Sequence, residues 1–473
     1  MRVLSESCVR IAIVALGLLG AFAEPGRAKA VELEFVDKKV LHRTYFAGVR
    51  EPEQFIGDHD IVVARSFDER FTYQFLAGSL GGARPSEKLR LIRFFGGLEQ
   101  SVEDFPACDP DIAETGRNDL AAANLTLTAG GVTATYQARC LNENGLHRGW
   151  VIGYLSWNAL NGTLRRGVIE AFDGPRRDLA FESFVHDGTL YVLTAAVRLF
   201  DQDGRVFLSA FELPSFRQKW QSWLPFRLEA DEARSFAIGP RPQGGVQVFA
   251  VGDFARRIDM AQIDADGTVV ETKRDFRVRV PPPDGAQDPV LLRSVTAADV
   301  ATLRGGDRVL AVRLQQTPRR DEVIREACQP LGEDGRSLGR ATPYLSAQDQ
   351  EEFSYQQFAA AKLSVDGAVA QHMTAIRIGP TIGEPRHDLR LRYIELDSAC
   401  EIVTRAVIAA DNVRLLGRED DALRGPFYVY PRDGDRLRVA VPTEGVSRSE
   451  LLELEFRVVG KEQEIAADQA PEP

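Results

Sequence analysis

The chain contains few of the residues that commonly build catalytic and metal centres. It has six histidines and five cysteines among 473 residues. No two histidines share a metal-ligand spacing, and no two cysteines have the spacing of a zinc or redox pair. There is no P-loop, GxSxG nucleophile elbow, HExxH zinc motif or GxGxxG nucleotide motif. The sequence therefore predicts no cofactor and no metal, and it does not decide whether the protein is an enzyme.

Long apolar segments are missing after the N-terminus. Arg2 and Arg10 flank the start of the chain, and the apolar run Ile11–Phe22 and small residues follow. This layout is typical of a secretory signal peptide rather than of a membrane-spanning helix. We expect cleavage after Ala23, with cleavage after Ala30 as the alternative. The mature protein is then exported, periplasmic or secreted, and has no membrane span.

Basic residues are outnumbered in this chain. Its 58 Lys and Arg residues face 69 Asp and Glu residues, which gives a formal net charge of −11. Such a balance argues against electrostatic attraction to nucleic acid or to anionic lipid. We expect a monomer whose partner is an unidentified small anion or a protein, with no nucleic acid.

Four cysteines remain after the leader, at Cys108, Cys140, Cys328 and Cys400. In an oxidising compartment an even number of cysteines suggests disulfides. Three connectivities are possible. We favour Cys108–Cys140 and Cys328–Cys400, because sequence neighbours usually lie close in space. The alternative is a set of buried free thiols.

A repeated pattern runs through the chain. Each copy has a short apolar strand, a Gly-containing turn and a second strand rich in Val and Leu, and most copies continue with a third and a fourth alternating run. Alternation with period two between Gly, Asp and Asn turns indicates β-strands. The seven copies begin at Arg43, Ala123, Glu182, Arg234, Arg293, Gln356 and Arg424.

Four strands per copy and seven copies predict an all-β fold, a seven-bladed β-propeller. The last copy supplies three strands, and the strand Val31–Asp37 is left over at the N-terminus. Pairing that strand with Leu451–Val458 would close the ring and cover two open edges. We therefore expect one domain over residues 31–460, followed by a disordered tail over 461–473. The alternative is that the two similar strands are unrelated edge strands.

One segment does not fit the repeat. Ser346–Leu363 has an N-cap candidate in Ser346, an acidic residue at Asp349 and several helix-favouring residues. It predicts a helix inserted between the fifth and sixth copies.

Two acidic turns, Asp201–Gly204 and Asp264–Gly267, alternate carboxylates before a glycine. This pattern resembles part of a calcium loop, but Asp-Gly is also a preferred hairpin turn, and neither segment has the distal Glu of a calcium loop. We favour hairpins and keep calcium as the alternative ligand.

Charged residues recur at the start of the predicted inner strands, where a propeller faces the mouth of its central channel. Guanidinium groups suit carboxylates and phosphates, so these residues form a candidate ring for an anionic ligand. The alternative is a network of salt bridges with acidic residues that lie just upstream. The candidate binding residues are Arg43, Glu182, Arg234, Arg293 and Arg424.

Tryptophans gather in two places, Trp150 to Trp157 and Trp220 to Trp223. Alternating aromatic residues on strands usually pack between sheets. We expect these to be core residues; exposed tryptophans would instead indicate carbohydrate or protein binding.

The segment Arg177–Leu193, "RDLAFESFVHDGTLYVL", is similar to blades of exported phytase-like esterases, in which an acidic residue precedes a DG turn and a second strand. This resemblance covers one blade, and it implies an esterase or phosphoesterase activity, with a metal-dependent enzyme as one form of it. Since fold does not fix function, the sequence favours a non-enzymatic binding module, with that hydrolase as the alternative.

Overall fold

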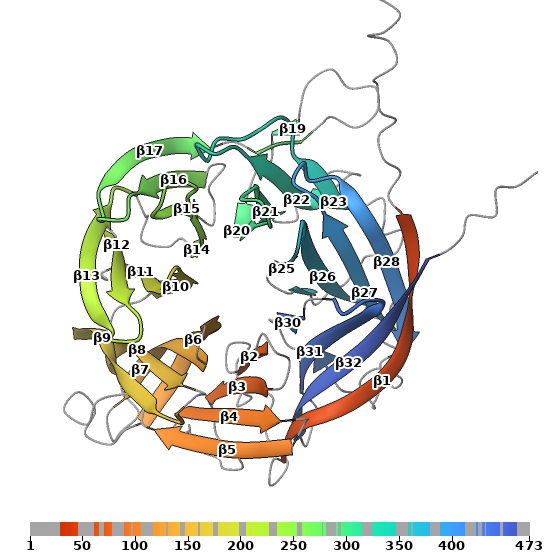
Figure 1. Ribbon diagram of the computed structural model, residues 1–473, viewed down its shortest axis with the longest axis horizontal. Coiled ribbons are helices and arrows are strands. Elements are labelled where there is room, and N and C mark those ends of the chain that lie inside the picture. Colours follow the sequence, from red (N-terminus) through yellow and green to blue (C-terminus); the bar gives the residue numbers. More distant parts are fainter. Residues whose placement is uncertain are drawn as a thin grey trace, which may run out of the picture.

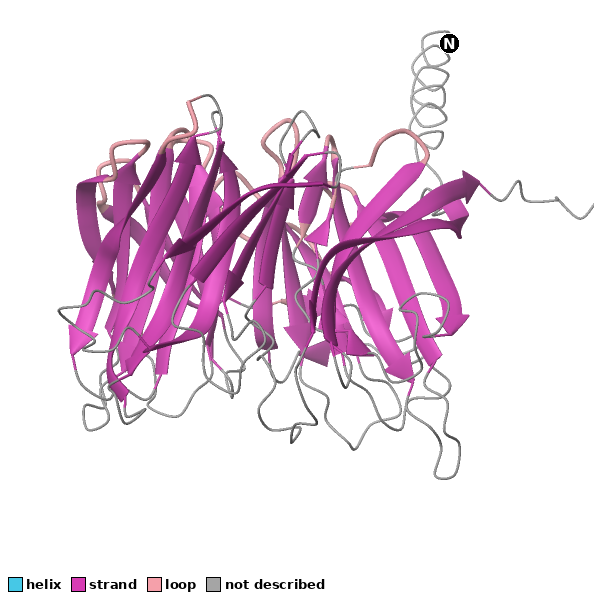
Figure 2. Cartoon of the chain, turned by 90° about the horizontal axis from the view of Figure 1, so that it is seen from below, coloured by secondary structure: helices cyan, strands magenta, loops and turns pink. Residues whose placement is uncertain are grey.

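A computed structural model gives the arrangement of the chain. It describes 24 stretches, with gaps between them: residues 29–45, 61–65, 71–77, 89–95, 98–105, 117–128, 131–141, 147–158, 161–173, 178–197, 205–226, 234–252, 258–276, 278–280, 290–291, 295–314, 324–346, 358–360, 363–378, 388–411, 422–423, 428–430, 432–444 and 448–460. Every regular element in these stretches is a β-strand (Figure 2).

Five separate antiparallel sheets of four strands follow one another along the chain. In each sheet the strands pair in chain order, as expected for strands joined by short turns. The sheets are β2–β5 (Ile61–Arg65, Phe71–Ala77, Leu89–Phe95, Leu98–Phe105), β6–β9 (Arg117–Thr128, Gly131–Leu141, His147–Asn158, Leu164–Asp173), β10–β13 (Asp178–His186, Thr189–Val197, Arg205–Glu212, Arg217–Leu224), β14–β17 (Arg234–Pro240, Val246–Gly252, Ile258–Ile263, Val269–Phe276) and β20–β23 (Val295–Thr302, Arg308–Leu314, Ile324–Leu331, Thr342–Ser346).

Ten of the remaining strands form one sheet, and β18 (Arg279–Val280) pairs with β19 (Val290–Leu291). The ten-stranded sheet has two antiparallel parts, which meet where the start of β1 runs parallel to β28 over two residue pairs. Its strands are β24 (Phe358–Ala360), β25 (Ser364–Asp366), β26 (Val369–Ile378), β27 (Asp388–Leu396), β28 (Ile402–Asp411), β1 (Lys29–Tyr45), β32 (Arg448–Gly460), β31 (Arg436–Glu444), β29 (Ala422–Leu423) and β30 (Tyr428–Val429).

The sheets stand around a common centre (Figure 1). The first strand of each four-stranded sheet lies nearest that centre and the last strand lies toward the outside, and most of the described turns gather on one face of the ring (Figures 1 and 2). Twisted four-stranded antiparallel sheets arranged in this way define a β-propeller. The fold is a β-propeller.

Apolar side chains fill the spaces between neighbouring sheets. One cluster joins β10–β13 to β14–β17, and it includes Leu193, Leu208 and Val248, each with no exposed surface. A second cluster joins β14–β17 to β20–β23 through Phe249 and Leu310. The period-two alternation of the strands puts one set of residues on each face, so the sheet β14–β17 is packed on both sides.

The N-terminal strand pairs with the last strand of the chain. β1 is antiparallel to β32 from Val31 to Tyr45, with two register shifts. Leu33 is 5% exposed in the core that β26–β28 and β30–β32 share, and the Phe35 and Phe456 rings meet edge to face at 5.9 Å. The predicted pairing of these two strands is confirmed.

Two sequence-based expectations about elements are wrong. β1 continues to Tyr45, so Arg43 lies in an outer strand opposite Glu450 and does not begin the first copy of the repeat. The helix predicted over Ser346–Leu363 is wrong at its two ends, where Ser346 belongs to β23 and Phe358–Ala360 forms β24. Pairing with neighbouring strands overrides local helix propensity at both ends. The middle of that segment lies outside the described residues.

The disulfide Cys328–Cys400 is present, as predicted, and it links β22 to the turn between β27 and β28. Both cysteines are fully buried. Cys140 is also disulfide-bonded. Its predicted partner, Cys108, lies outside the described residues, as do the predicted signal peptide over residues 1–23 and the predicted tail over residues 461–473.

Candidate functional site

Glu182 lies in the innermost strand β10, as the repeat predicted, and is half-buried. Its Oε1 accepts a hydrogen bond from Asn124 Nδ2 of β6 at 2.8 Å and another from the Ser183 amide at 3.1 Å. Beside this contact, the hydroxyls of Thr135 and Ser183 lie 2.6 Å apart. Glu182 therefore joins the inner strands of two neighbouring sheets.

The other members of the predicted anion ring are distributed differently. Arg234 is the first residue of the inner strand β14, opposite Gly252. Arg43 belongs to the outer strand β1 and is not part of the inner set. Arg293, Gln356 and Arg424 lie outside the described residues, so a ring of arginines stays a prediction.

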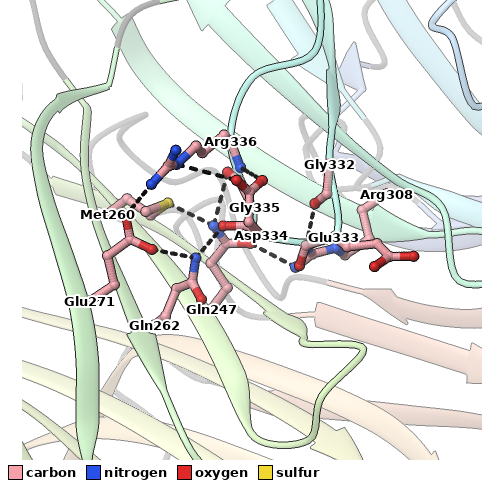
Figure 3. Close-up of polar contacts among 10 residues, drawn as sticks. All are labelled: Gln247, Met260, Gln262, Glu271, Arg308, Gly332, Glu333, Asp334, Gly335 and Arg336. Carbon is pink, nitrogen blue, oxygen red and sulfur yellow. Dashed lines mark hydrogen bonds and ion pairs between the residues drawn. The ribbon is translucent and has the colours of Figure 1, made fainter.

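A buried arginine that the sequence analysis missed lies between β14–β17 and β20–β23. Arg308, in β21, is 2% exposed. Its Nη1 donates to the Pro240 carbonyl at 3.2 Å and to Gln247 Oε1 at 2.7 Å. Its Nη2 donates to the carbonyls of Gly332 at 2.6 Å and Glu333 at 3.0 Å (Figure 3). These neutral oxygens satisfy four of the donors of one buried cation.

The turn between β22 and β23 reaches across to the preceding sheet. Gln247 Nε2 donates to the Gly335 carbonyl at 3.1 Å, and Gln262 donates to the Asp334 carbonyl and to Glu271 Oε2 (Figure 3). Gly335 has a φ of +71°, and a Cβ there would overlap the Gln247 amide. Only glycine therefore fits this close approach.

The outer part of the same contact is ionic. Arg336 Nε lies 3.2 Å from Asp334 Oδ2, and its Nη2 lies 3.6 Å from Glu271 Oε1. These side chains are partly exposed, so solvent screens their attraction. The buried amides and Arg308, rather than these ion pairs, fix how the two sheets sit.

Burial has a cost for Arg308. Removal from water lowers the pKa of its guanidinium, and the nearby Arg241 charge lowers that pKa further, while Asp334 opposes the change. The sequence did contain a signal for this residue: Arg308 follows a Gly-Gly-Asp turn at an inward position of an alternating strand. Which sheet it would face does not follow from that pattern.

Buried carboxylates link the later sheets. Glu326 of β22 is 1% exposed; its Oε2 lies 3.4 Å from His372 Nδ1 and accepts a hydrogen bond from the Thr374 hydroxyl at 3.2 Å. His372 and Thr374 both lie in β26, in the following sheet. The carboxylate thus joins two sheets in the way that Glu182 does.

Glu395 of β27 makes a similar link within the ten-stranded sheet, to the segment between β30 and β31. Its Oε1 lies 3.0 Å from Arg432 Nη1 and accepts a hydrogen bond from the Tyr393 hydroxyl at 2.8 Å. Desolvation, with the Glu395 charge beside it, raises the pKa of Tyr393 well above its ordinary value, so this phenol remains a neutral donor.

The tryptophans differ in their exposure. Trp150 and Trp157 are 3% and 8% exposed, as expected for core residues. Trp220 is half-buried: it packs beside Tyr191 and donates from Nε1 to the Ala265 carbonyl. Trp223 is 60% exposed on the outer strand β13, so the prediction of a core position is wrong for this residue. Trp223 lies in the outermost strand of the sheet β10–β13, where no described strand covers its side chain. We call this outer edge of the sheet the Trp223 rim.

The acidic turn Asp264–Gly267 is a hairpin turn between β16 and β17. The Gly267 amide donates to the Asp264 carbonyl at 3.0 Å, and Gly267 has a φ of +91°. Backbone bonding at Asp266 and Thr268 lowers the pKa of the Asp266 carboxyl. Asp201–Gly204 lies outside the described residues. In the described part of the chain no three His, Cys, Asp or Glu side chains gather closely enough to hold a metal ion.

Within the described stretches there is also no helix long and apolar enough to cross a membrane.

No family model and no curated protein matches the chain. Several solved structures are similar to it at low identity. A polysaccharide lyase, a PL25 ulvan lyase, has a TM-score of 0.45 and 10% identity, over 86% of this chain and 96% of the lyase. The WD40 domain of SCAP from fission yeast has a TM-score of 0.38 and 11% identity, over 92% and 97% of the two chains. A GH43 endo-arabinanase from Bacillus licheniformis has a TM-score of 0.31 and 13% identity, over 76% and 99%.

Proposed function

We propose that this protein is a seven-bladed β-propeller closed by its N-terminal strand, and that it acts as an exported binding module. Five four-stranded sheets supply five blades. The ten-stranded sheet supplies two more, because β1 meets β28 over only two residue pairs but runs beside β32 through most of its length. Export is supported by the leader-like N-terminus and by the disulfide Cys328–Cys400.

The exposed ring of Trp223 is the observation that carries the binding function. A tryptophan is a large apolar side chain, and it is enriched in recognition surfaces because it combines contact area with one donor. Trp223 lies opposite Phe207, which is half-buried, and both face the side of the sheet that carries Thr194. Gln221, two residues earlier, faces the same side and donates to Ser209 Oγ at 3.1 Å. The Trp223 rim therefore presents an exposed indole ring beside the side-chain amide of Gln221, which its hydrogen bond to Ser209 holds in place.

The contacts of three carboxylates between neighbouring parts of the ring support a scaffold more than acid–base chemistry. Glu182, Glu326 and Glu395 each bind a side chain of a neighbouring sheet or blade. A carboxylate committed to such a contact positions structure and is less available for proton transfer. The unidentified ligand is then a small anion at the centre of the ring or a molecule held at the Trp223 rim.

Isothermal titration calorimetry of the full-length protein tests this function, because it needs no tryptophan as reporter. The probes are neutral oligosaccharides, sugar acids and phosphate esters. We expect one class to bind and Trp223→Ala to weaken it at least tenfold, which corresponds to about 1.4 kcal/mol. Val168→Ala is the matched control, since Val168 is 42% exposed on the outer strand of the neighbouring sheet. Absence of binding by all three classes, or equal affinity in Trp223→Ala, would contradict the proposal.

Two further variants separate the alternatives. Loss of anion binding in Arg234→Ala, with Trp223→Ala unaffected, would move the ligand to the start of the inner strands. The esterase alternative rests on Glu182, which lies in an inner strand and is only half-buried. Hydrolysis of p-nitrophenyl phosphate that Glu182→Gln abolishes, with or without added calcium, would favour that alternative.

A further inference from the structure

Beside the Trp223 rim, the outer strand of one sheet approaches the second strand of the next sheet. β9 and β13 are the outermost strands of these two sheets and lie on the outside of the ring (Figure 1). Glu170 of β9 is half-buried, and its Oε2 accepts a hydrogen bond from the Thr194 hydroxyl of β11 at 3.2 Å. At this level the sheet β6–β9 therefore contacts its neighbour two strands inside β13.

A row of three residues runs outward from that contact. Thr194 lies directly opposite Phe207 of β12, and Phe207 lies directly opposite Trp223 of β13. Residues opposite each other in antiparallel strands share one face of the sheet. Exposure rises along the row, from 3% at Thr194 through the half-buried Phe207 to 60% at Trp223. Since adjacent strands are about 4.8 Å apart, these residues and Glu170 form a ledge that extends roughly 10 Å from Thr194 to Trp223.

Polar side chains border this ledge. Gln221, two residues before Trp223, faces the same side, and its Nε2 donates to Ser209 Oγ at 3.1 Å. Ser209 is 5% exposed and Gln221 is exposed, so the hydrogen bond holds an amide that a ligand can reach. A side-chain amide can donate and accept, whereas the Glu170 carboxylate accepts. The ledge thus combines an exposed aromatic ring with a positioned amide and a carboxylate.

This combination matches the chemistry of a neutral sugar chain. A sugar ring has an apolar face of C–H groups that packs on an aromatic ring, and its hydroxyl groups donate to carboxylates and exchange hydrogen bonds with amides. The negative charge of Glu170 repels a sugar acid or a phosphate ester. A protein partner would need a broad apolar centre around the indole. The described side chains beside Trp223 on this face, Phe207 apart, are instead Gln221, Ser209 and Thr194.

We propose that the ledge binds a neutral oligosaccharide. Trp223 stacks on one sugar ring, Glu170 accepts hydrogen bonds from sugar hydroxyls, and Gln221 exchanges hydrogen bonds with the same chain. Thr194 is a positioning residue, because its hydroxyl donates to the Glu170 carboxylate and so orients it. The inference rests on the proposed binding function of the Trp223 rim, and it selects one ligand class among those that the rim could hold.

A glycan array followed by isothermal titration calorimetry tests the proposal with the full-length protein. The array presents neutral and acidic oligosaccharides, and the strongest neutral glycan is then titrated into the wild type and the variants. We expect acidic glycans to bind at least about tenfold more weakly than neutral ones. Trp223→Ala should weaken the neutral glycan at least about tenfold, and Trp223→Phe, which keeps an aromatic ring, should lose less.

A second set of variants tests the carboxylate. Glu170→Gln should weaken the neutral glycan about fivefold, because hydrogen bonds to a charged acceptor are stronger than those to an amide. The same variant should bind acidic glycans better than the wild type does, since the repulsion is gone. Glu401→Gln is the matched control: Glu401 is exposed in the turn between β27 and β28, and its variant should bind like the wild type.

The outcomes separate this inference from the proposed function. Binding of acidic glycans or phosphate esters alone, lost in Trp223→Ala, would overturn the neutral ligand and leave a binding module at the Trp223 rim. Absence of binding by every class would overturn both. Neutral binding that is unchanged in Trp223→Ala or in Glu170→Gln would refute the ledge as the site. Because Trp223 is 60% exposed, its variants keep this test decisive even where Glu170→Gln fails to fold.

Discussion

The closing strand offers the sharpest test of the architecture. Leu33 of β1 is 5% exposed, whereas Val36 of the same strand is 45% exposed. Leu33→Ala removes three carbons, each worth about 0.8 kcal/mol of burial. The cavity left behind brings the expected loss to about 3 kcal/mol. Val36→Ala removes two carbons that are half in water, and we expect less than about 1 kcal/mol.

Hydrogen exchange measured by mass spectrometry is the appropriate assay, because a protein built of many sheets need not unfold in one step. If β1 opens locally, a loss of about 3 kcal/mol speeds amide exchange roughly 100-fold. The effect should appear in peptides from Lys29–Tyr45 and Arg448–Gly460, which pair along their length. Peptides from the sheet β10–β13 should be unchanged.

The comparison between the two variants decides the interpretation. Equal exchange in Leu33→Ala and Val36→Ala would mean that the N-terminal strand does not bury Leu33 in the shared core. Faster exchange across all sheets would mean that the ring opens as one unit. In either case the proposed closure by a separable N-terminal strand would be refuted.

Three further predictions follow from single contacts. Removal of the Cys328–Cys400 disulfide, whose cysteines are separated by 72 positions, should cost up to about 4 kcal/mol by the loop-entropy relation, and denaturant unfolding of the Cys328→Ala, Cys400→Ala double variant against the wild type measures this loss. Gly335→Ala should destabilise the protein by about 2–3 kcal/mol, since the turn must move away from Gln247; a melting temperature equal to the wild type would contradict the contact. Burial raises the pKa of the Tyr136 phenol above its unfolded value of about 10. The stability that the neutral phenol contributes is therefore complete below about pH 10 and is lost as pH rises above it. Between about pH 9 and 11, urea unfolding of the wild type should lose more stability than that of Tyr136→Phe.

The sequence predicts strand positions well where a tight turn bounds the strand, as two strands illustrate. The runs Val206–Leu213 and Leu389–Leu396 correspond closely to β12 and β27. In both, alternate side chains are buried between two sheets, and the turn residues set where pairing begins. β1 was predicted too short, because its two register shifts interrupt the alternation after Phe35 and after Val40.

The polar contacts between sheets were not predictable in the same way. The sequence placed Glu182 in an inner strand, but its partner Asn124 lies 58 positions away in another sheet. Arg308 contacts Gln247, 61 positions away, and Gly332, 24 positions away. Such pairs depend on how the sheets are ordered around the ring and on how far each turn projects. The period-two pattern of a strand carries no information about the order of the sheets or the projection of the turns.

This difference bears on where a ligand can bind. Propeller blades need only alternating apolar residues to pack. This chain nevertheless places Glu182, Arg308 and Glu326 between its sheets and Glu395 between two parts of the ten-stranded sheet, and it gives each a partner. Buried polar contacts of this kind are satisfied at one relative position of the two sheets, so they fix geometry more narrowly than apolar packing does. A rigid ring with an exposed aromatic side chain at its rim binds at low cost in conformational entropy.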